Sequence, residues 1–175
     1  MTKQEYYRLL DAAKAKRDIR LWLLMQTICG TGIRVSELKF ITLDAARKGR
    51  AVVSLKGKTR MVLLPTDLCR KLMRYAKEQN IGSGSIFITR TGKPLDRSNI
   101  LHAMKELCKM AKVDRKKVFP HNLRHLFACL YYKAVKDISR LADLLGHTSV
   151  NTTRIYTSVS GEEQVREIGQ LRLVI

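Results

Sequence analysis

The residues of this chain that are best suited to chemistry lie in its last third. The run Pro-His-Asn-Leu-Arg-His holds His121, Arg124 and His125, Leu-Gly-His holds His147, and Tyr156 follows nine residues later. An arginine fork binds two phosphate oxygens at once, an imidazole moves protons near neutral pH, and a tyrosine oxygen forms covalent intermediates. Together these side chains supply the parts needed to hold and attack a phosphodiester.

The charge of the chain favours a nucleic-acid partner. Among its 175 residues, 34 Lys plus Arg against 15 Asp plus Glu give a formal charge of +19. Such a surplus repels itself in the folded state, and nucleic acid is the commonest polyanion that uses it. Aromatic residues make up only 6%, which argues against a stacking platform for single strands, so we expect double-stranded DNA. Ribosomal-type RNA packing and acidic lipid are the alternatives.

The composition also limits the fold and the compartment. Hydrophobic residues make up 45% of the chain, which is enough for one domain with a real core. No stretch approaches the ~18 apolar residues of a membrane span, and the start of the chain resembles a helix capping box more than a signal peptide. We therefore expect a cytoplasmic protein with no membrane partner. The four cysteines lie far apart, which predicts reduced structural thiols.

The pattern of apolar residues predicts an α+β fold that is mostly α-helical and has a small antiparallel sheet. The predicted helices cover 2–16, 18–28, 66–79, 96–112, 121–134 and 138–145, followed by a short helix that carries Tyr156. The predicted strands are 51–55 and 60–64, joined by a type II′ turn at Gly57-Lys58, with a third short strand at 86–88. A tail helix is expected from about residue 162.

Five motifs occur in a fixed order along the chain. They are Gly32-Ile-Arg-Val-Ser-Glu-Leu38, Leu55-Lys-Gly57, His121 to His125, Leu145-Gly-His147, and Thr153 to Tyr156. Each motif alone is weak, but the ordered and correctly spaced set closely resembles the catalytic domain of the tyrosine recombinases, the phage-integrase family. The resemblance implies that family's fold over 1–160, with a three-stranded sheet on one side. It also implies that the family's amino-terminal core-binding domain is absent from this chain.

The resemblance assigns several residues to the phosphate. Arg34 and Arg124 would clamp the scissile phosphate, and His147 would hydrogen-bond to it. Glu37 and His125 would be supporting residues that orient the others.

The resemblance assigns the chemical step to three further residues. Tyr156 would form a 3′-phosphotyrosyl link, Lys56 would protonate the 5′ oxygen, and His121 would assist proton transfer. Lys58 competes with Lys56 for the lysine position. Because side chains alternate along a strand, Lys56 is expected on the face of Ser54, opposite the apolar face, so we favour it.

Other basic residues are candidates for contacts with the DNA backbone, although a plain solvated surface is nearly as good an interpretation. The candidates are Lys58, Arg60, Arg90, Lys93, Arg97, Arg115, Lys116 and Lys117.

Simpler interpretations exist for individual residues. A tyrosine such as Tyr156, taken alone, is more often part of a core. His121 and His125 have a spacing that would suit zinc on a helix, but the glutamate of the metalloprotease motif and a third ligand are missing. We therefore expect no metal and no cofactor.

The sequence as a whole predicts an enzyme that cleaves and rejoins DNA at specific sites, an integrase or recombinase of a bacterial chromosome or mobile element. We expect it in the bacterial cytoplasm, associated with the nucleoid, as a tetramer on DNA and a monomer or weak oligomer alone. The tail, 161–175, either docks onto a neighbouring protomer or folds back in cis. The alternatives are resealing of the same strand, as in a type IB topoisomerase, and non-catalytic DNA binding.

Overall fold

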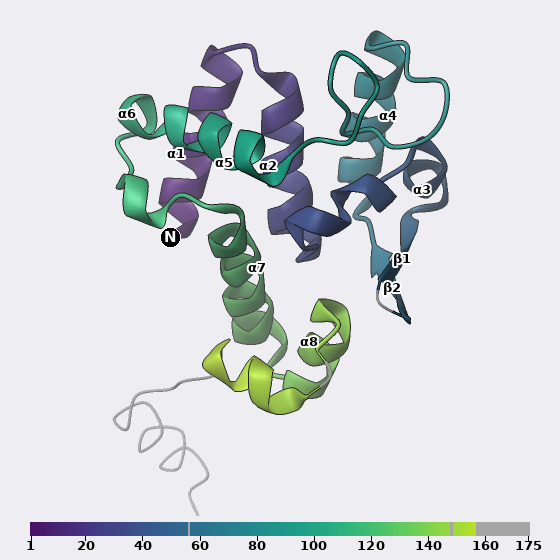
Figure 1. The fold of residues 1–175 in the computed structure, drawn as a ribbon. Coiled ribbons are helices and arrows are strands. Elements are labelled where there is room, and N and C mark those ends of the chain that lie inside the picture. Colours follow the sequence, from purple (N-terminus) through teal and green to yellow (C-terminus); the bar gives the residue numbers. More distant parts are fainter. Residues whose placement is uncertain (56, 148, 157–175) are drawn as a thin grey trace, which may run out of the picture.

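Helices dominate the structure, a computed structural model that describes residues 1–55, 57–147 and 149–156 (Figure 1). The α-helices are α1 (Lys3–Ala15), α2 (Ile19–Thr31), α3 (Leu43–Lys48), α4 (Thr66–Glu78), α5 (Arg97–Glu106), α6 (Cys108–Ala111), α7 (Pro120–Val135) and α8 (Ile138–Leu145). The 3₁₀-helices are η1 (Val35–Phe40), η2 (Arg115–Lys117) and η3 (Val150–Tyr156), and the strands are β1 (Arg50–Leu55) and β2 (Lys58–Leu63). The predicted helical fold with a small antiparallel sheet is confirmed. Lys56 and the tail, 161–175, lie outside the described residues.

Local signals in the sequence set the ends of the first two helices. Thr2 forms the predicted capping box with Glu5, and the Asp18 side chain accepts a hydrogen bond from the Leu21 N–H at the start of α2. Helix α2 ends at Gly32, whose φ of +66° is left-handed. A β-carbon at Gly32 would lie only 2.6 Å from Phe127 Cδ1, so both the backbone and the packing require glycine there.

The predicted helix boundaries needed two corrections. The helix expected over 96–112 is divided into α5 and α6, which meet at Leu107. Helix α3 was not predicted, although Thr42 caps its first turn and Gly49 ends it with a φ of +68°. Its short length leaves only a weak apolar period to detect.

The sheet differs from the prediction in its turn. Strands β1 and β2 pair antiparallel with Leu55 opposite Lys58, so the connection consists of Lys56 and Gly57 and not of Gly57 and Lys58. Gly57 has a φ of +73°, a left-handed value that glycine adopts at no steric cost. The backbone of Lys58 therefore begins β2 and is not the tip of the turn.

The prediction of a third strand was wrong. Among the described residues, the segment around 86–88 forms only isolated bridges, Thr42 with Ser85 and Ile88 with Pro94. Proline has no N–H to extend a ladder, and Ile86 and Phe87 are instead buried in the apolar core. The apolar run was therefore correctly predicted as buried but not as a strand.

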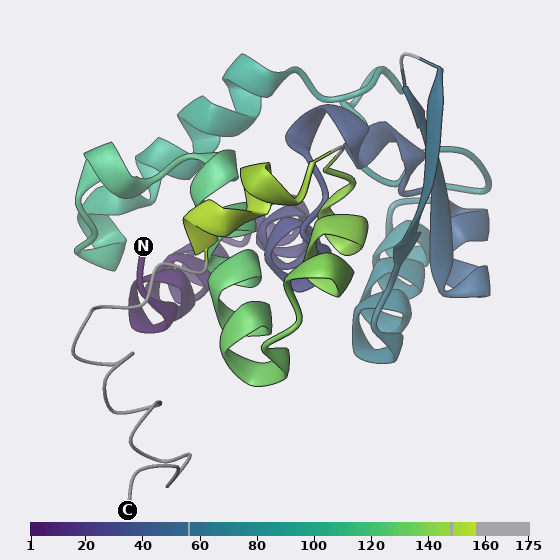
Figure 2. The same ribbon diagram turned by 90° about the horizontal axis from the view of Figure 1, so that it is seen from below.

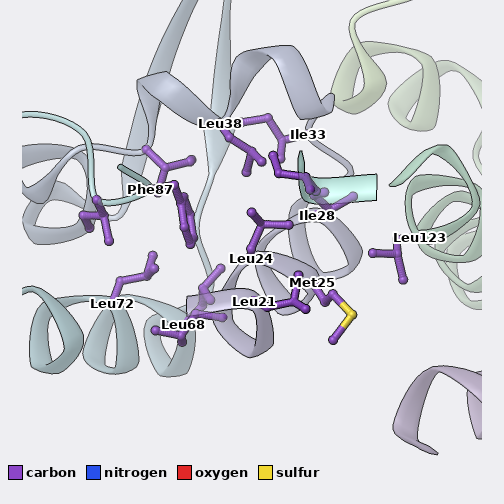
Figure 3. Packing of buried hydrophobic residues seen from close by; sticks show 14 of the residues in the cluster. Leu21, Leu24, Met25, Ile28, Ile33, Leu38, Leu68, Leu72, Phe87 and Leu123 are labelled. Carbon is purple, nitrogen blue, oxygen red and sulfur yellow. The ribbon is translucent and has the colours of Figure 1, made fainter. Parts of the chain in front are cut away.

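Most of the apolar core surrounds α2. This helix is apolar on nearly all sides, and Leu24, Met25 and Ile28 lie at the centre with Leu72 of α4 and Phe87 packed nearby (Figure 3). All four cysteines are free thiols, as predicted. In the described part of the chain, no helix combines the length and the apolar character needed to cross a membrane.

A second, smaller apolar cluster lies beyond the main core. Helix α7 packs against α2, and α8 and η3, which follow it, turn back against α7 (Figures 1 and 2). The buried members of this cluster are Ala128, Leu141, Leu145 and Tyr156. Two of the residues predicted to do chemistry, His147 and Tyr156, are therefore on this smaller unit or directly beside it.

Candidate active site

The end of α8 brings three arginines together from distant parts of the chain. The last carbonyl groups of a helix have no partner within the helix and carry partial negative charge, so they favour cationic donors. Here each of three successive carbonyls accepts a hydrogen bond from a different guanidinium. The pairs are Arg60 Nη1 with Leu144 O at 2.9 Å, Arg124 Nη2 with Leu145 O at 2.7 Å, and Arg34 Nη2 with Gly146 O at 3.1 Å.

Glu37 supplies the carboxylate of this cluster. Its side chain is buried, and its two oxygens form ion pairs with Arg34 Nη1 at 3.0 Å and Arg60 Nη2 at 2.6 Å. It also accepts a hydrogen bond from the Arg34 backbone N–H at 2.9 Å. Burial alone would raise the pKa of Glu37, but the Arg34 N–H and the two guanidiniums outweigh burial and lower it. Arg34 and Arg60 thus share one carboxylate, and the third guanidinium, Arg124, bonds to the end of α8 beside them, which leaves the cluster positive.

Arg124 is the buried member of the three, with only 3% of the residue exposed. Besides the α8 carbonyl, it donates to Gly32 O at the end of α2 and meets His147 Nε2 at 3.1 Å. Burial, followed by the charges of Arg34 and Arg60, lowers the pKa of Arg124 to about 10, so it stays charged at neutral pH. The Arg34 side chain is 41% exposed and is therefore the fork that solvent reaches.

The hydrogen bonds of His147 fix its tautomer. Because a guanidinium only donates, Nε2 of His147 accepts from Arg124, and Nδ1 carries the proton toward Thr153 Oγ1 at 2.9 Å. The Thr153 side chain is fully buried. Burial, with the charges of Arg124 and Arg34, lowers the pKa of His147 to about 4. His147 is therefore neutral at pH 7 before any anion binds.

Tyr156 ends η3 and is buried, with 7% exposure. Its ring lies between two imidazoles, edge-on to His125 with ring centroids 5.0 Å apart and stacked on His147 at 6.4 Å. Burial raises the pKa of Tyr156, and the nearby charge of Arg124 opposes this rise. The His147 ring thus connects Tyr156 to Arg124 of the guanidinium cluster.

The two histidines of α7 are placed differently. His121 is exposed at the start of the helix, whereas His125 is half-buried and its Nδ1 lies 3.3 Å from Cys129 Sγ. The pKa of His125 is lowered mainly by burial, with a contribution from His121. The structure therefore brings Arg34, Glu37, Arg124, His125, His147 and Tyr156 into one contiguous group, with His121 at its exposed edge.

Two further residues, Arg60 and Thr153, join this group and were not predicted there. Arg60 was assigned to DNA contact, yet its guanidinium joins Glu37 and α8. Thr153 was noted only as part of a motif, and its contact with His147 was not foreseen. The signals available in the sequence were a threonine three residues before the tyrosine and an arginine in phase with Val62 and Leu64 along the strand.

The remaining candidates for DNA contact lie on the surface. The exposed ones are Arg90, Lys93, Arg97, Arg115, Lys116 and Lys117. Two of them face acidic side chains: Lys117 Nζ lies 3.0 Å from Glu5, and Arg115 Nη1 lies 4.0 Å from Glu106. The side chain of Lys58, like Lys56, is outside the described part. Within residues 1–55, 57–147 and 149–156, no three His, Cys, Asp or Glu side chains form a group that could hold a metal ion.

Comparisons with known proteins identify the relatives of this chain. A sequence profile of the phage integrase family matches residues 1–163. The tyrosine recombinase XerH of Campylobacter jejuni is 32% identical over 173 residues, which are 93% of this chain and 49% of that protein. The chain spans about half the length of this curated relative and 58% of the tyrosine recombinase XerD of Bifidobacterium longum.

Solved structures show the same fold. A crystal structure of XerA recombinase is 28% identical, with a TM-score of 0.80 over 100% of this chain and 64% of that one. XerH recombinase bound to its difH substrate is 27% identical, with a TM-score of 0.77 over 94% of this chain and 51% of that one. The profile match over most of the sequence, the shared fold and the five ordered motifs together show that the chain belongs to the phage integrase family and has the fold of a tyrosine recombinase catalytic domain.

Proposed function

We propose that this chain is the catalytic part of a site-specific DNA recombinase. It cleaves one strand, holds the cut end as a 3′-phosphotyrosine, and joins that end to a partner strand. One observation carries the proposal: the Tyr156 ring stacks on His147, which contacts Arg124 within a cluster of three guanidiniums around one carboxylate. A nucleophile beside a positive, partly exposed cluster of side chains suits an anionic ester.

The cluster would bind the scissile phosphate through its unbalanced charge. Arg34, the exposed fork, would meet the non-bridging oxygens first, and Arg124 would stabilise the charge that builds on them. A phosphate oxygen has no proton to offer, so His147 must donate to it from Nε2. It gains that proton either by becoming cationic or by changing tautomer, and the Thr153 hydroxyl suits both states because it donates and accepts.

Cleavage would be a balanced exchange of esters. The Tyr156 oxygen bonds to phosphorus and loses its proton, while the bond from phosphorus to the 5′ oxygen breaks and that oxygen gains a proton. The family resemblance gives Lys56 the role of acid and His121 a role in proton transfer. Because a tyrosine ester replaces a phosphodiester, the bond energy is kept for the reverse step, in which a 5′ hydroxyl displaces the phenolate.

The partners follow from the charge and from the family. Double-stranded DNA would be held mainly through its phosphates by the exposed basic residues, with affinity that falls steeply with salt. Exchange between two duplexes requires several protomers, and we propose a tetramer on DNA. The catalytic domain would cover 1–160, with 161–175 as a docking tail. A protein acting on chromosomal or mobile-element DNA would work in the bacterial cytoplasm at the nucleoid.

The test is capture of the covalent intermediate. The protein is mixed with a library of duplexes that carry a randomised core and a nick close to it, so that the short cleaved fragment diffuses away and traps the product. A protein–DNA band that resists denaturation is expected with the wild type and is expected to be lost with Tyr156→Phe. Tyr131→Phe is the matched control, because Tyr131 is partly buried against the same cluster.

The outcomes separate the competing functions. Strand exchange between two differently labelled duplexes of the captured sequence supports a recombinase. Relaxation of supercoiled DNA with no exchange would indicate a topoisomerase-like enzyme. DNA binding without a covalent band would indicate a non-catalytic DNA-binding protein.

A further inference from the structure

Arg60 occupies an inward position on β2. Val62 and Leu64, two and four residues further on, are both buried, and alternation along a strand puts Arg60 on their face. Met61 and Leu63, on the opposite face, are exposed. The Arg60 side chain is accordingly only 15% exposed. An arginine that points toward the body of the protein is poorly placed for a surface contact with DNA.

The guanidinium of Arg60 joins three elements. It extends from β2, forms an ion pair with Glu37 of η1 at 2.6 Å, and donates to the Leu144 carbonyl of α8 at 2.9 Å. Its aliphatic part crosses Gly146, where a β-carbon would overlap Arg60 Cδ. Gly146 is also left-handed, with a φ of +63°. The chain thus has glycine at the point where Arg60 passes.

Direct contact between Arg60 and a phosphate does not fit this arrangement. Both terminal nitrogens are bonded to protein acceptors, and Nε is buried without a partner among the described residues. Arg60 instead contacts Glu37, which in turn holds the exposed Arg34 side chain. Its ion pair occupies Oε2 of Glu37, which leaves Arg34 bonded to Oε1 through one nitrogen and to Gly146 O through the other.

We propose that Arg60 is a positioning residue for strand cleavage, which holds Glu37 and the end of α8 so that Arg34 and His147 meet the phosphate. The inference rests on the proposed function. Without Arg60, Oε2 of Glu37 would keep only the Arg34 backbone N–H as a donor. It could then also accept from the Arg34 guanidinium, take that fork bidentately and draw it away from the phosphate. The Leu144 carbonyl would also lose its donor, which loosens the helix end that precedes His147.

The first experiment separates binding from reaction. Arg60→Met and Arg60→Lys are compared with Arg50→Met, because Arg50 is an exposed arginine on the neighbouring strand. The rate of covalent-complex formation on a captured nicked duplex is measured at saturating protein, with DNA affinity and thermal unfolding measured in parallel. We expect Arg60→Met to react about 100-fold more slowly with DNA affinity nearly unchanged, and Arg60→Lys to recover part of the rate. Arg50→Met should react like the wild type.

A second readout tests how Arg60 acts. Replacing the 5′-bridging oxygen with sulfur gives a leaving group that needs no proton, so it rescues the loss of an acid but not the loss of the clamp on the non-bridging oxygens. We expect the Arg60→Met defect to persist on this substrate. Lys56→Ala is the comparison, and its rate should be restored if Lys56 is the acid.

Three results would overturn the inference: rescue of Arg60→Met by sulfur, a rate loss explained entirely by weaker DNA binding, or wild-type rates in Arg60→Met. The failure of the proposed function looks different. In that case the wild type itself forms no covalent complex on either substrate, and this inference is then rejected together with it.

Discussion

The two apolar clusters of this protein are held together by different forces. The large one surrounds α2, and side chains such as Leu24, Met25 and Leu72 are almost completely buried there (Figure 3). The small one contains four buried residues, one of which is Tyr156. Beside it, the guanidinium bonds to the end of α8 and to Glu37 replace much of the missing apolar contact. Apolar packing has no directional preference, whereas these bonds fix directions and rearrange when an anion arrives.

This difference fits the place that we propose for the chemistry. A phosphate pocket needs charge concentrated in one place, and that charge repels itself until the anion arrives. The large cluster around α2 offsets the free energy of this repulsion, because buried apolar area stabilises it. The site can therefore be built from polar contacts on a smaller unit. Substitutions in the large cluster should lower stability and spare the reaction rate, whereas substitutions in the site should lower the reaction rate more than stability.

The largest effect is expected from Arg124→Ala compared with Leu24→Ala. Loss of Arg124 removes donors to two carbonyls and to His147, so we expect covalent-complex formation to fall by roughly 10³-fold. Leu24→Ala creates a cavity in the large cluster and should lower the free energy of unfolding by about 2–5 kcal/mol, with the reaction rate kept at temperatures where the protein stays folded. Single-turnover cleavage and denaturant unfolding of both variants check this. Equal loss of activity in the two would contradict the comparison.

An intermediate effect is expected from Gly146→Ala compared with Gly49→Ala. Both glycines follow a helix in the left-handed region, with φ of +63° and +68°, so both substitutions carry a similar backbone penalty of about 1 kcal/mol. Only at Gly146 does the new methyl group overlap the Arg60 side chain, whereas at Gly49 its nearest neighbour is 4.0 Å away. We expect cleavage to fall about 10- to 100-fold for Gly146→Ala and to change little for Gly49→Ala. Equal cleavage rates in the two variants would show that the Arg60 side chain can move aside for the new methyl group.

The smallest effect is expected in the pH dependence of stability. Folding lowers the pKa of His147 to about 4 from an unfolded value near ~6.5, so between these values the unfolded chain binds the extra proton. Its contribution to stability is therefore complete above pH ~6.5 and is lost as the pH falls toward 4. Thermal unfolding of the wild type should weaken over this range more than that of His147→Gln. The loss should be modest because the ring is partly exposed, and identical pH profiles would contradict the assignment.

Much of the fold could be predicted because its signals are local. Thr2 and Asp18 mark helix starts, Gly32 marks an end, and the apolar period identifies α4, α7 and α8. The errors occurred where local signals are weak or ambiguous: the short α3, the register of the turn at Gly57, and the buried 86–88 segment that forms no ladder.

The sequence alone predicted Arg34, Arg124, His147 and Tyr156 as site residues, because they occur in ordered motifs with fixed spacing. It also determined a net charge of +19, which favours a polyanionic partner. Only the tertiary structure decided how these residues are arranged. Arg34 meets a carbonyl 112 residues away and Arg60 one 84 residues away, and no local period encodes such contacts. The proton position on His147, the sharing of Glu37 and the inward direction of Arg60 all depend on where α8 ends in space.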